Sequence, residues 1–292
     1  MWCNVRILFG VGTGLGTGFG VFKLRQSSAE NQMKSPFSLA VPPQEDIRRL
    51  HKCPYLSWDY NWDRRAKLKK DANGNLTIDD SKNAKLRRYL ILINDCHYVN
   101  NEESDAPSMT ALGESQAQAL VRFLVDWLGW EEWLPNTTIV HSPLKRSRKL
   151  AKIISKEMAT IPVRELELLE EGLPTARSPP PMDDPVSPNK VHTDYPRMEA
   201  GFRALFYRPA PTQKEQSVEI VLAHPNVIRY FVCRALQLPP EAFSRFSLKH
   251  ASMTRIEIFG NGVVNVVSVG DTGYLTPDKF TFGEIEAVLP VL

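Results

Sequence analysis

The apolar residues between positions 86 and 281 follow two patterns. The first is a set of short, nearly continuous apolar runs, which are typical of strands buried on both faces of a sheet. Two of these runs flank Gly260-Asn261-Gly262, a strong signal for a tight hairpin. The predicted strands are Tyr89–Ile93, Thr138–His141, Val163–Leu168, Val218–Ala223, Met253–Ile258 and Val263–Val269.

The second pattern places apolar residues three or four positions apart, which predicts helices with one buried face. Thr110 stands where its hydroxyl can cap the first of these helices. Because helices alternate with strands, we expect an α/β fold in which a mostly parallel sheet is covered by helices on both faces. The predicted helices are Ala111–Leu128, Leu144–Met158, Met198–Tyr207 and Val227–Leu236.

Length and composition allow one large domain with accessory segments, since the chain has 292 residues of which 42% are hydrophobic. We expect the domain to cover residues 86–281, after a polar, proline-punctuated linker at 26–85 and before a tail at 282–292. The Lys and Arg residues are scattered and the formal net charge is +3, which argues against a nucleic-acid partner. The four cysteines show no paired spacing, so no zinc site is predicted.

The first 25 residues include an uncharged, glycine-rich stretch, Ile7–Phe22, between Arg6 and Lys23. It is slightly short for a membrane-spanning helix, which needs about 17–25 apolar residues, but its small residues would allow close helix packing in lipid. A secretory signal and a glycine-rich tail without fixed structure are the alternatives. No acidic residue precedes Glu30, as organelle import favours. We therefore expect residues 1–25 to be a membrane anchor or an uncleaved targeting segment.

Two tryptophans, Trp58 and Trp62, stand out in the predicted linker within the run Trp58–Arg65. Two indole rings are costly to leave in water, so we expect them to pack on another surface. That surface belongs either to their own domain or to a second subunit, and the residues alone leave both readings open.

Polar residues cluster where the predicted strands end. In open α/β sheets, ligands bind beyond the carboxyl ends of the strands. A single histidine or arginine at a strand end is usually structural, but several polar strand ends converging on one edge predict a functional site. The clusters are Asn94-Asp95-Cys96-His97, His141-Ser142 with Arg146, Glu170-Glu171-Gly172 and His224-Pro225-Asn226.

These clusters resemble the motifs of the phosphoglycerate mutase-like proteins of the histidine phosphatase superfamily. The family pattern has a strand followed by Arg-His-Gly or Arg-His-Ser, then Leu-Thr-x-x-Gly-x-x-Gln-Ala, Ser-x-x-x-Arg, Glu-Gly-x-Pro and a late strand ending in His. The resemblance implies a three-layer αβα sandwich, and we expect no cofactor and no metal. The corresponding stretches here are Leu92–Cys96, Thr110–Ala117, Ser142–Arg146, Glu171–Pro174 and Ala223-His224.

Further stretches narrow the resemblance to one branch of the family, the mitochondrial, membrane-anchored serine/threonine protein phosphatases. This likeness covers roughly Trp58 to Lys279 and implies a location at a mitochondrial membrane. In this branch a Trp-Asp-x-Asn-Trp-Asp segment drives multimer assembly, here Trp58, Asp59, Asn61, Trp62 and Asp63. The stretches that carry the likeness are Trp58–Arg65, His224–Tyr230, Cys233–Gln237 and Gly270–Gly273.

The resemblance also assigns roles. In the family the first His attacks phosphorus, two Arg and a second His hold the phosphate oxygens, and a carboxylic acid protonates the leaving oxygen. Carried over by motif, Arg146 is a phosphate clamp, His224 is the second His and Glu171 is the acid. Asn94 stands where the first Arg belongs and Asp95 where the nucleophile belongs, so both positions are degenerate.

Glu170 stands where this branch usually has Arg. These departures change the expected charge of the pocket, because Asp95 and Glu170 bring carboxylates to a site whose ligand is a dianion. One like-charge contact near 4 Å costs about 4 kcal/mol at an effective dielectric constant of 20, or about three decades of affinity. His97 lies about 6.5 Å further along an extended chain, and the thiolate of Cys96 is disfavoured beside Asp95. An aspartyl phosphate on Asp95 would need a divalent metal to mask the charge.

We therefore expect a mitochondrial, membrane-tethered pseudophosphatase that acts by binding and assembly in mitochondrial signalling or dynamics. Its expected partners are phosphoproteins or other mitochondrial proteins, with assembly as a homo-oligomer or with an active relative. The alternative is a serine/threonine phosphatase with weak or unconventional activity, supported by Arg146, Glu171 and His224. A metabolic mutase is a third and more distant reading.

Overall fold

The computed structural model describes residues 58–66, 68–71, 76–78, 86–99, 108–130, 136–178 and 188–283. The described residues all belong to one compact unit that begins at Trp58. The predicted anchor, residues 1–25, lies outside the described residues. Within the described stretches, no helix combines the length and the apolar character needed to cross a membrane.

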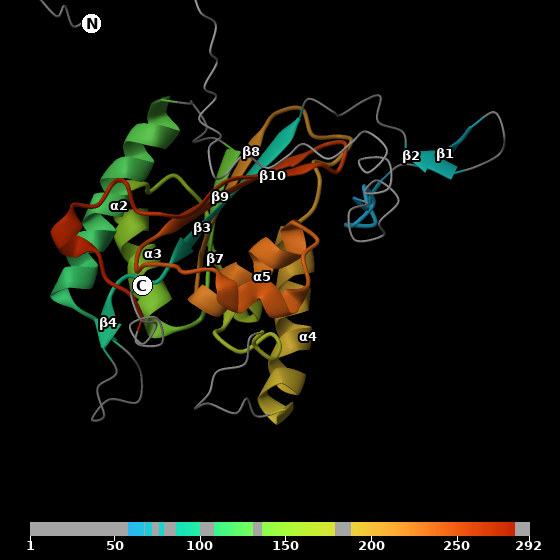
Figure 1. Cartoon of the computed structure of the whole chain (residues 1–292). Helices are drawn as coiled ribbons and strands as arrows, with labels where there is room; N and C mark the ends of the chain where they lie inside the picture. The colour runs from blue at the N-terminus through green and yellow to red at the C-terminus, as the bar shows by residue number, and fades with distance from the viewer. Residues whose placement is uncertain are drawn as a thin grey trace, which may run out of the picture. The chain divides into compact units, whose positions relative to one another are not determined.

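A six-stranded sheet with the order β10-β9-β3-β8-β6-β7 forms the centre of this unit (Figure 1). The neighbours β3 and β8, β8 and β6, and β6 and β7 are parallel, whereas β9 runs antiparallel to both β3 and β10. The mostly parallel sheet is thus confirmed. The strands are β3 (Arg87–Asn94), β6 (Thr137–His141), β7 (Val163–Glu165), β8 (Ser217–Ala223), β9 (Met253–Phe259) and β10 (Val264–Asp271).

Helices cover both faces of the sheet, which gives the expected three-layer α/β fold (Figure 1). Successive side chains of a strand point to opposite faces, and in β3 Ile91 and Ile93 join one core while Leu90 and Leu92 join the other. The first core lies under α2 (Ala111–Trp130) and α3 (Lys145–Glu157), and the second under α4 (Pro188–Leu205) and α5 (Pro225–Ala235).

The unit also contains short strands and 3₁₀ turns. The strand β4 (Tyr98–Val99) pairs with β5 (Ser108–Met109), just before the Thr110 hydroxyl accepts the Gly113 N–H at the start of α2, 3.1 Å away. The predicted cap is therefore confirmed. The 3₁₀ turns are η3 (Glu167–Leu169), η4 (Pro240–Arg245) and η5 (Pro277–Lys279).

Two predicted elements had the wrong extent. The strand expected at Val163–Leu168 ends at Glu165, and the chain then turns into η3 to bury Leu169. The helix expected at Met198–Tyr207 starts ten residues earlier, at Pro188, and ends at Leu205. Its first half is mostly polar and exposed and contains Pro196, so the apolar period that marks a helix is absent there.

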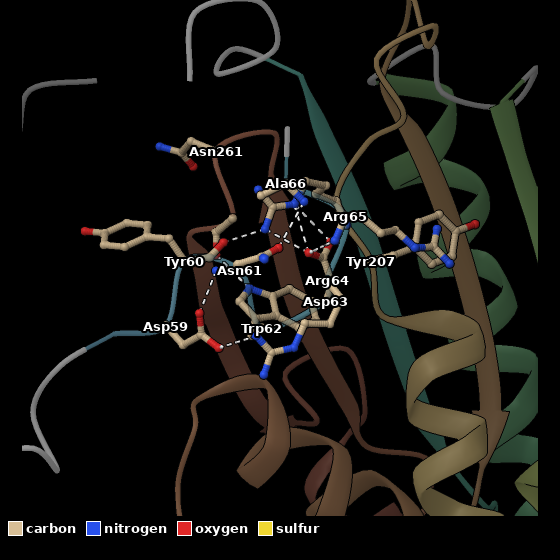
Figure 2. Close-up of polar contacts among 12 residues, drawn as sticks. Asp59, Tyr60, Asn61, Trp62, Asp63, Arg64, Arg65, Ala66, Tyr207 and Asn261 are labelled. Carbon is tan, nitrogen blue, oxygen red and sulfur yellow. Dashed lines mark hydrogen bonds and ion pairs between the residues drawn. The ribbon is translucent and has the colours of Figure 1, made fainter. Parts of the chain in front are cut away.

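The predicted linker contains ordered structure that its polar sequence did not indicate. The strand β1 (Leu68–Lys70) pairs antiparallel with β2 (Leu76–Ile78). Before them, Trp58 and Trp62 both donate their indole N–H to the Gly262 carbonyl, at 3.2 and 2.8 Å. Figure 2 shows this segment beside the β9–β10 turn. The two rings therefore dock on their own domain, and their part in multimer assembly stays a prediction.

A buried ion pair holds the same segment. Asp63 is bound by the Arg208 guanidinium, with Nη2 2.8 Å from Oδ1, and by the Arg208 backbone N–H, 2.8 Å from Oδ2. Burial alone would raise the pKa of Asp63, but the hydrogen bonds and charge of Arg208 lower it. The carboxylate therefore stays ionised and ties residues 58–66 to the end of α4.

Gly262→Ala is expected to loosen this docked segment and lower the free energy of unfolding by about 2 kcal/mol. Gly262 has φ +87°, and an added Cβ would lie 2.3 Å from the Tyr60 carbonyl oxygen and 2.8 Å from Arg208 Nη2. Urea unfolding and the tryptophan emission maximum measure the effect. The control is Gly129→Ala in α2, where an added Cβ meets nothing within 4 Å. Equal stability of both variants would contradict the docking.

Candidate functional site

The carboxyl ends of the parallel strands bring the predicted site residues together. In register, Asn94 of β3 pairs with Ala223 of β8, and His141 of β6 pairs with Leu222. The residues that follow these strands therefore meet at one edge of the sheet. Side-chain contacts bring Asp95, Arg146, Glu171 and His224 together there, as predicted.

Asp95 lies at the centre of this cluster and is 2% exposed. Its Oδ2 accepts a hydrogen bond from Arg146 Nε at 2.7 Å and lies 2.5 Å from His224 Nδ1. Its Oδ1 accepts the Ser147 hydroxyl at 3.2 Å. Burial alone would raise the pKa of Asp95, but the attraction and hydrogen bonds of His224 and Arg146 lower it below its usual value. The buried carboxylate is therefore an anion with polar partners on both oxygens.

Arg146, from the first turn of α3, is the buried cation of the site. Besides Asp95 it binds the Glu171 carboxylate through Nη2, and its guanidinium lies 4.6 Å from the centre of the Tyr98 ring. Burial alone would lower the pKa of Arg146, but the charges of Asp95 and Glu171 raise it. The guanidinium is thus shared between two carboxylates of its own chain.

His224 is fully buried and bonded at both ring nitrogens. Its Nε2 lies 2.6 Å from the Ser142 hydroxyl, and its Nδ1 lies 3.0 Å from Arg146 Nη2 as well as 2.5 Å from Asp95. Arginine has only N–H donors, so an Nδ1–H directed at Asp95 leaves Nδ1 unable to accept from Arg146. The short contact to the carboxylate therefore sets the tautomer of the ring.

The connection Asp95–His224–Ser142 has the order of a serine-hydrolase relay. A nucleophile must touch its substrate, however, and Ser142 is 0% exposed. Its hydroxyl also accepts the Leu144 backbone N–H at 3.3 Å. Ser142 therefore positions the imidazole and is not placed to attack an external substrate.

The other predicted residues lie around this cluster. Asn94 Nδ2 donates to the Lys249 carbonyl at 2.9 Å, while its buried Oδ1 has no hydrogen-bond partner in the described part of the chain. Glu170 is exposed, so Asp95 alone brings the expected additional charge into the buried site. Burial and the charge of Asp95 raise the pKa of the Cys96 thiol well above its usual value, which opposes thiolate chemistry.

His97 is held by other contacts and is not positioned as a substitute nucleophile. Its Nδ1 lies 2.8 Å from the Thr110 hydroxyl, and its ring meets the edge of His250 with centroids 5.3 Å apart. Burial, with a smaller contribution from His97, lowers the pKa of His250 to about 4.

Among the described residues, no group of three or more His, Cys, Asp or Glu side chains is arranged to hold a metal ion.

Sequence reasoning assigned no role to several residues that shape the site. Ser147 donates its hydroxyl to Asp95, Tyr98 lies against the guanidinium of Arg146, and His250 packs against His97. Ser142 belongs to the Ser-x-x-x-Arg motif and Ser147 follows it directly, so the motif could have indicated both. Tyr98 and His250 come from a short strand and a loop, where no periodic pattern predicts which way a side chain points.

Comparisons with known proteins show which family the chain is similar to. The sequence pattern of the histidine phosphatase superfamily (branch 1) covers residues 99–174 and 182–272, and thus starts after Asn94 and Asp95. The mitochondrial serine/threonine-protein phosphatases PGAM5 of rat and human are 37% and 36% identical over 235 residues, covering 77% of this chain and 80% of each relative. The Caenorhabditis elegans protein of the same name is 35% identical over 244 residues, with coverages of 78% and 82%.

A solved structure, the phosphoglycerate mutase of Plasmodium falciparum, aligns with 64% of this chain and 92% of its own at 25% identity and a TM-score of 0.45. The family pattern covers more than half of this chain, and the sequence relatives cover more than two thirds of it. The chain therefore belongs to branch 1 of the histidine phosphatase superfamily and is a mitochondrial, PGAM5-like member of it.

Proposed function

We propose that this chain is a mitochondrial pseudophosphatase that acts by binding and assembly and not by phosphoester hydrolysis. The observation that carries the proposal is the Asp95 carboxylate, held 2.7 Å from Arg146 Nε and 2.5 Å from His224 Nδ1. These two side chains are the ones that the family resemblance assigns to the phosphate oxygens. Asp95 therefore acts as an internal anion in the position of the substrate.

The ion pair opposes binding of a phosphoryl dianion in two ways. Taking Arg146 from Asp95 would leave a buried, uncompensated carboxylate, which costs about 3–5 kcal/mol. A dianion near the same carboxylate adds repulsion of about 4 kcal/mol for a unit-charge contact near 4 Å at a dielectric constant of 20. Since about 1.4 kcal/mol is a factor of ten in affinity, either effect alone weakens phosphate binding by at least a hundredfold.

The chemical step is impaired as well. A histidine nucleophile attacks through a free ring nitrogen, whereas both carboxylate oxygens of Asp95 accept hydrogen bonds from its neighbours. The nearby thiol of Cys96 is fully buried and its pKa is raised, and His97 is bonded to Thr110. Neither supplies a replacement attacking group.

A binding role accounts for what the chain retains. Its fold is that of the family, and its Trp58–Ala66 segment is ordered against its own domain. We propose that the protein works at a mitochondrial membrane, as a homo-oligomer or together with an active relative, and that it contacts phosphoproteins or other protein partners there. Co-purification with an active PGAM5 tests this part of the proposal, and consistent failure to associate would count against it.

Hydrolysis of a phosphoserine peptide tests the proposed inactivity. We expect the purified chain to turn the peptide over at least about a thousandfold more slowly than human PGAM5, because both phosphate binding and the attacking group are compromised. We also expect His224→Ala to leave the residual rate unchanged. The second candidate, a weak phosphatase, is favoured by the convergence of Arg146, Glu171 and His224. A measurable rate that vanishes in His224→Ala would establish that candidate instead.

A further inference from the structure

A second cluster of charge lies away from the Asp95 site, where the docked segment meets α4 and α5. A hollow of about 270 Å³ opens there, and three arginines from three different segments line it: Arg64, Arg203 and Arg234. The half-buried Trp62 contributes an aromatic wall, and the buried ring of Phe202 lies behind it, with ring centroids 6.0 Å apart. We call this feature the arginine hollow.

Cations outnumber the carboxylates that contact them in the arginine hollow. Glu199 binds Arg203 at 2.8 Å and Arg234 at 3.0 Å, so one carboxylate serves two guanidinium groups. Burial alone would raise the pKa of Glu199, but the hydrogen bonds of Arg234 and Tyr230 lower it, which favours the ionised carboxylate. Asp59 lies 3.9 Å from Arg64, beyond hydrogen-bond distance. The three arginines thus face two carboxylates.

The exposed arginines are available to a ligand. The side chain of Arg64 is 73% exposed and that of Arg203 is 62% exposed. Figure 2 shows Arg64 beside Trp62 and joined to Asp59. A guanidinium presents a planar set of N–H donors that suits carboxylates, and an aromatic wall beside it suits an apolar neighbour of that carboxylate.

The backbone of the arginine hollow is held in strained conformations. Arg64 has φ 56° and Gln237 has φ 55°, both in the left-handed region that favours glycine. Gln237 also clamps the opposite wall, since its Oε1 accepts the Asp59 N–H at 2.9 Å and its Nε2 donates to the Asp59 carbonyl at 3.1 Å. Strained residues that persist on a well-bonded surface are typical of binding sites, where they fix side-chain directions in advance.

We infer that the arginine hollow binds an acidic peptide segment of a protein partner. The excess of arginine selects a carboxylate, and the half-buried indole ring of Trp62 accommodates an adjacent apolar side chain. The volume of about 270 Å³ lies just below the roughly 300–1,000 Å³ of small-molecule pockets, which suits one or two peptide side chains. The inference rests on the proposed function, because it supplies a surface through which a pseudophosphatase would recognise a partner.

Fluorescence anisotropy with a labelled short peptide of alternating Glu and Phe tests the inference on the full chain. The matched probe carries Gln in place of each Glu. We expect the acidic peptide to bind at low salt, to bind more weakly at high salt, and to outcompete the Gln peptide. Arg64→Gln with Arg203→Gln should weaken binding by at least about tenfold, since hydrogen bonds to charged groups are lost.

The control is Arg148→Gln. Arg148 is an exposed arginine that is ion-paired with Glu165, and it belongs to α3, which covers the opposite face of the sheet. It should change the affinity by less than about twofold. No binding of the acidic peptide to the wild-type chain, equal binding of both peptides, or an unchanged affinity in the double variant would each overturn the inference. The phosphopeptide rate of the wild-type chain, measured on the same preparation, separates this failure from that of the proposed function.

Discussion

The double substitution Asn94→Arg with Asp95→His is expected to raise phosphopeptide turnover by about three decades or more over the wild-type chain. Removing the carboxylate releases Arg146 and His224 from their contacts with Asp95, so both can face a phosphate. The substitutions also introduce an attacking imidazole and a second guanidinium. Electrostatic repulsion is therefore replaced by attraction at the same time as a nucleophile is supplied.

The single variants separate these contributions. Asp95→His alone should gain part of the rate, whereas Asp95→Asn should gain phosphate binding but no turnover, because an amide neither repels the dianion nor attacks it. Asn94 is 1% exposed, so the new arginine has to find room beside the Lys249 carbonyl, and circular dichroism must show that the variant is folded. A folded double variant as inactive as the wild type would contradict the view that the rest of the pocket is intact.

Arg146→Met is expected to lower the free energy of unfolding by about 3–5 kcal/mol. The substitution leaves Asp95 buried among His224, Ser147 and apolar neighbours without its guanidinium partner. Glu171 loses an ion pair as well, but its side chain is 36% exposed, so water compensates most of that loss. Urea unfolding at neutral pH measures the effect.

A double-mutant cycle identifies the cause of this loss. Asp95→Leu combined with Arg146→Met removes both charges, and it should recover most of the stability lost in Arg146→Met, because a buried ion pair is often replaceable by apolar residues. Arg148→Met, at an exposed position two residues further along α3, is the control and should leave the midpoint of urea unfolding nearly unchanged. Additive losses in the double variant would show that Asp95 and Arg146 are not coupled.

Most of the fold could be predicted because its signals are local. The apolar run of β3 and the capping threonine before α2 each mark an element without reference to the rest of the chain. The full length of α4 could not be predicted, since its first half is exposed, polar and interrupted by Pro196. The docking of Trp58 and Trp62 depends on the Gly262 carbonyl some two hundred residues away, which no local pattern encodes.

The sequence could predict which residues lie together at the candidate site, but not the contacts between them. Strand ends and motif spacing placed Asp95, Arg146, Glu171 and His224 together, as the structure confirms. The sequence indicated that Asp95 would repel a phosphate, but it did not show that the carboxylate binds the very groups expected to hold one. The sequence also suggested that the Glu170 carboxylate would enter the pocket, whereas the chain turns after η3 and leaves Glu170 exposed. The contacts of Asp95 and the exposure of Glu170 both depend on how separate elements pack together, which a local sequence pattern does not specify.

Titration calorimetry with orthophosphate, on the wild-type chain and on Asp95→Ala, tests most directly whether Asp95 occupies the anion position. We predict no detectable binding to the wild-type chain and binding at least about a hundredfold tighter to Asp95→Ala, lost again when Arg146→Met is added. Orthophosphate binding to the wild-type chain as tight as to Asp95→Ala would contradict the account, because the carboxylate would then not exclude the substrate group.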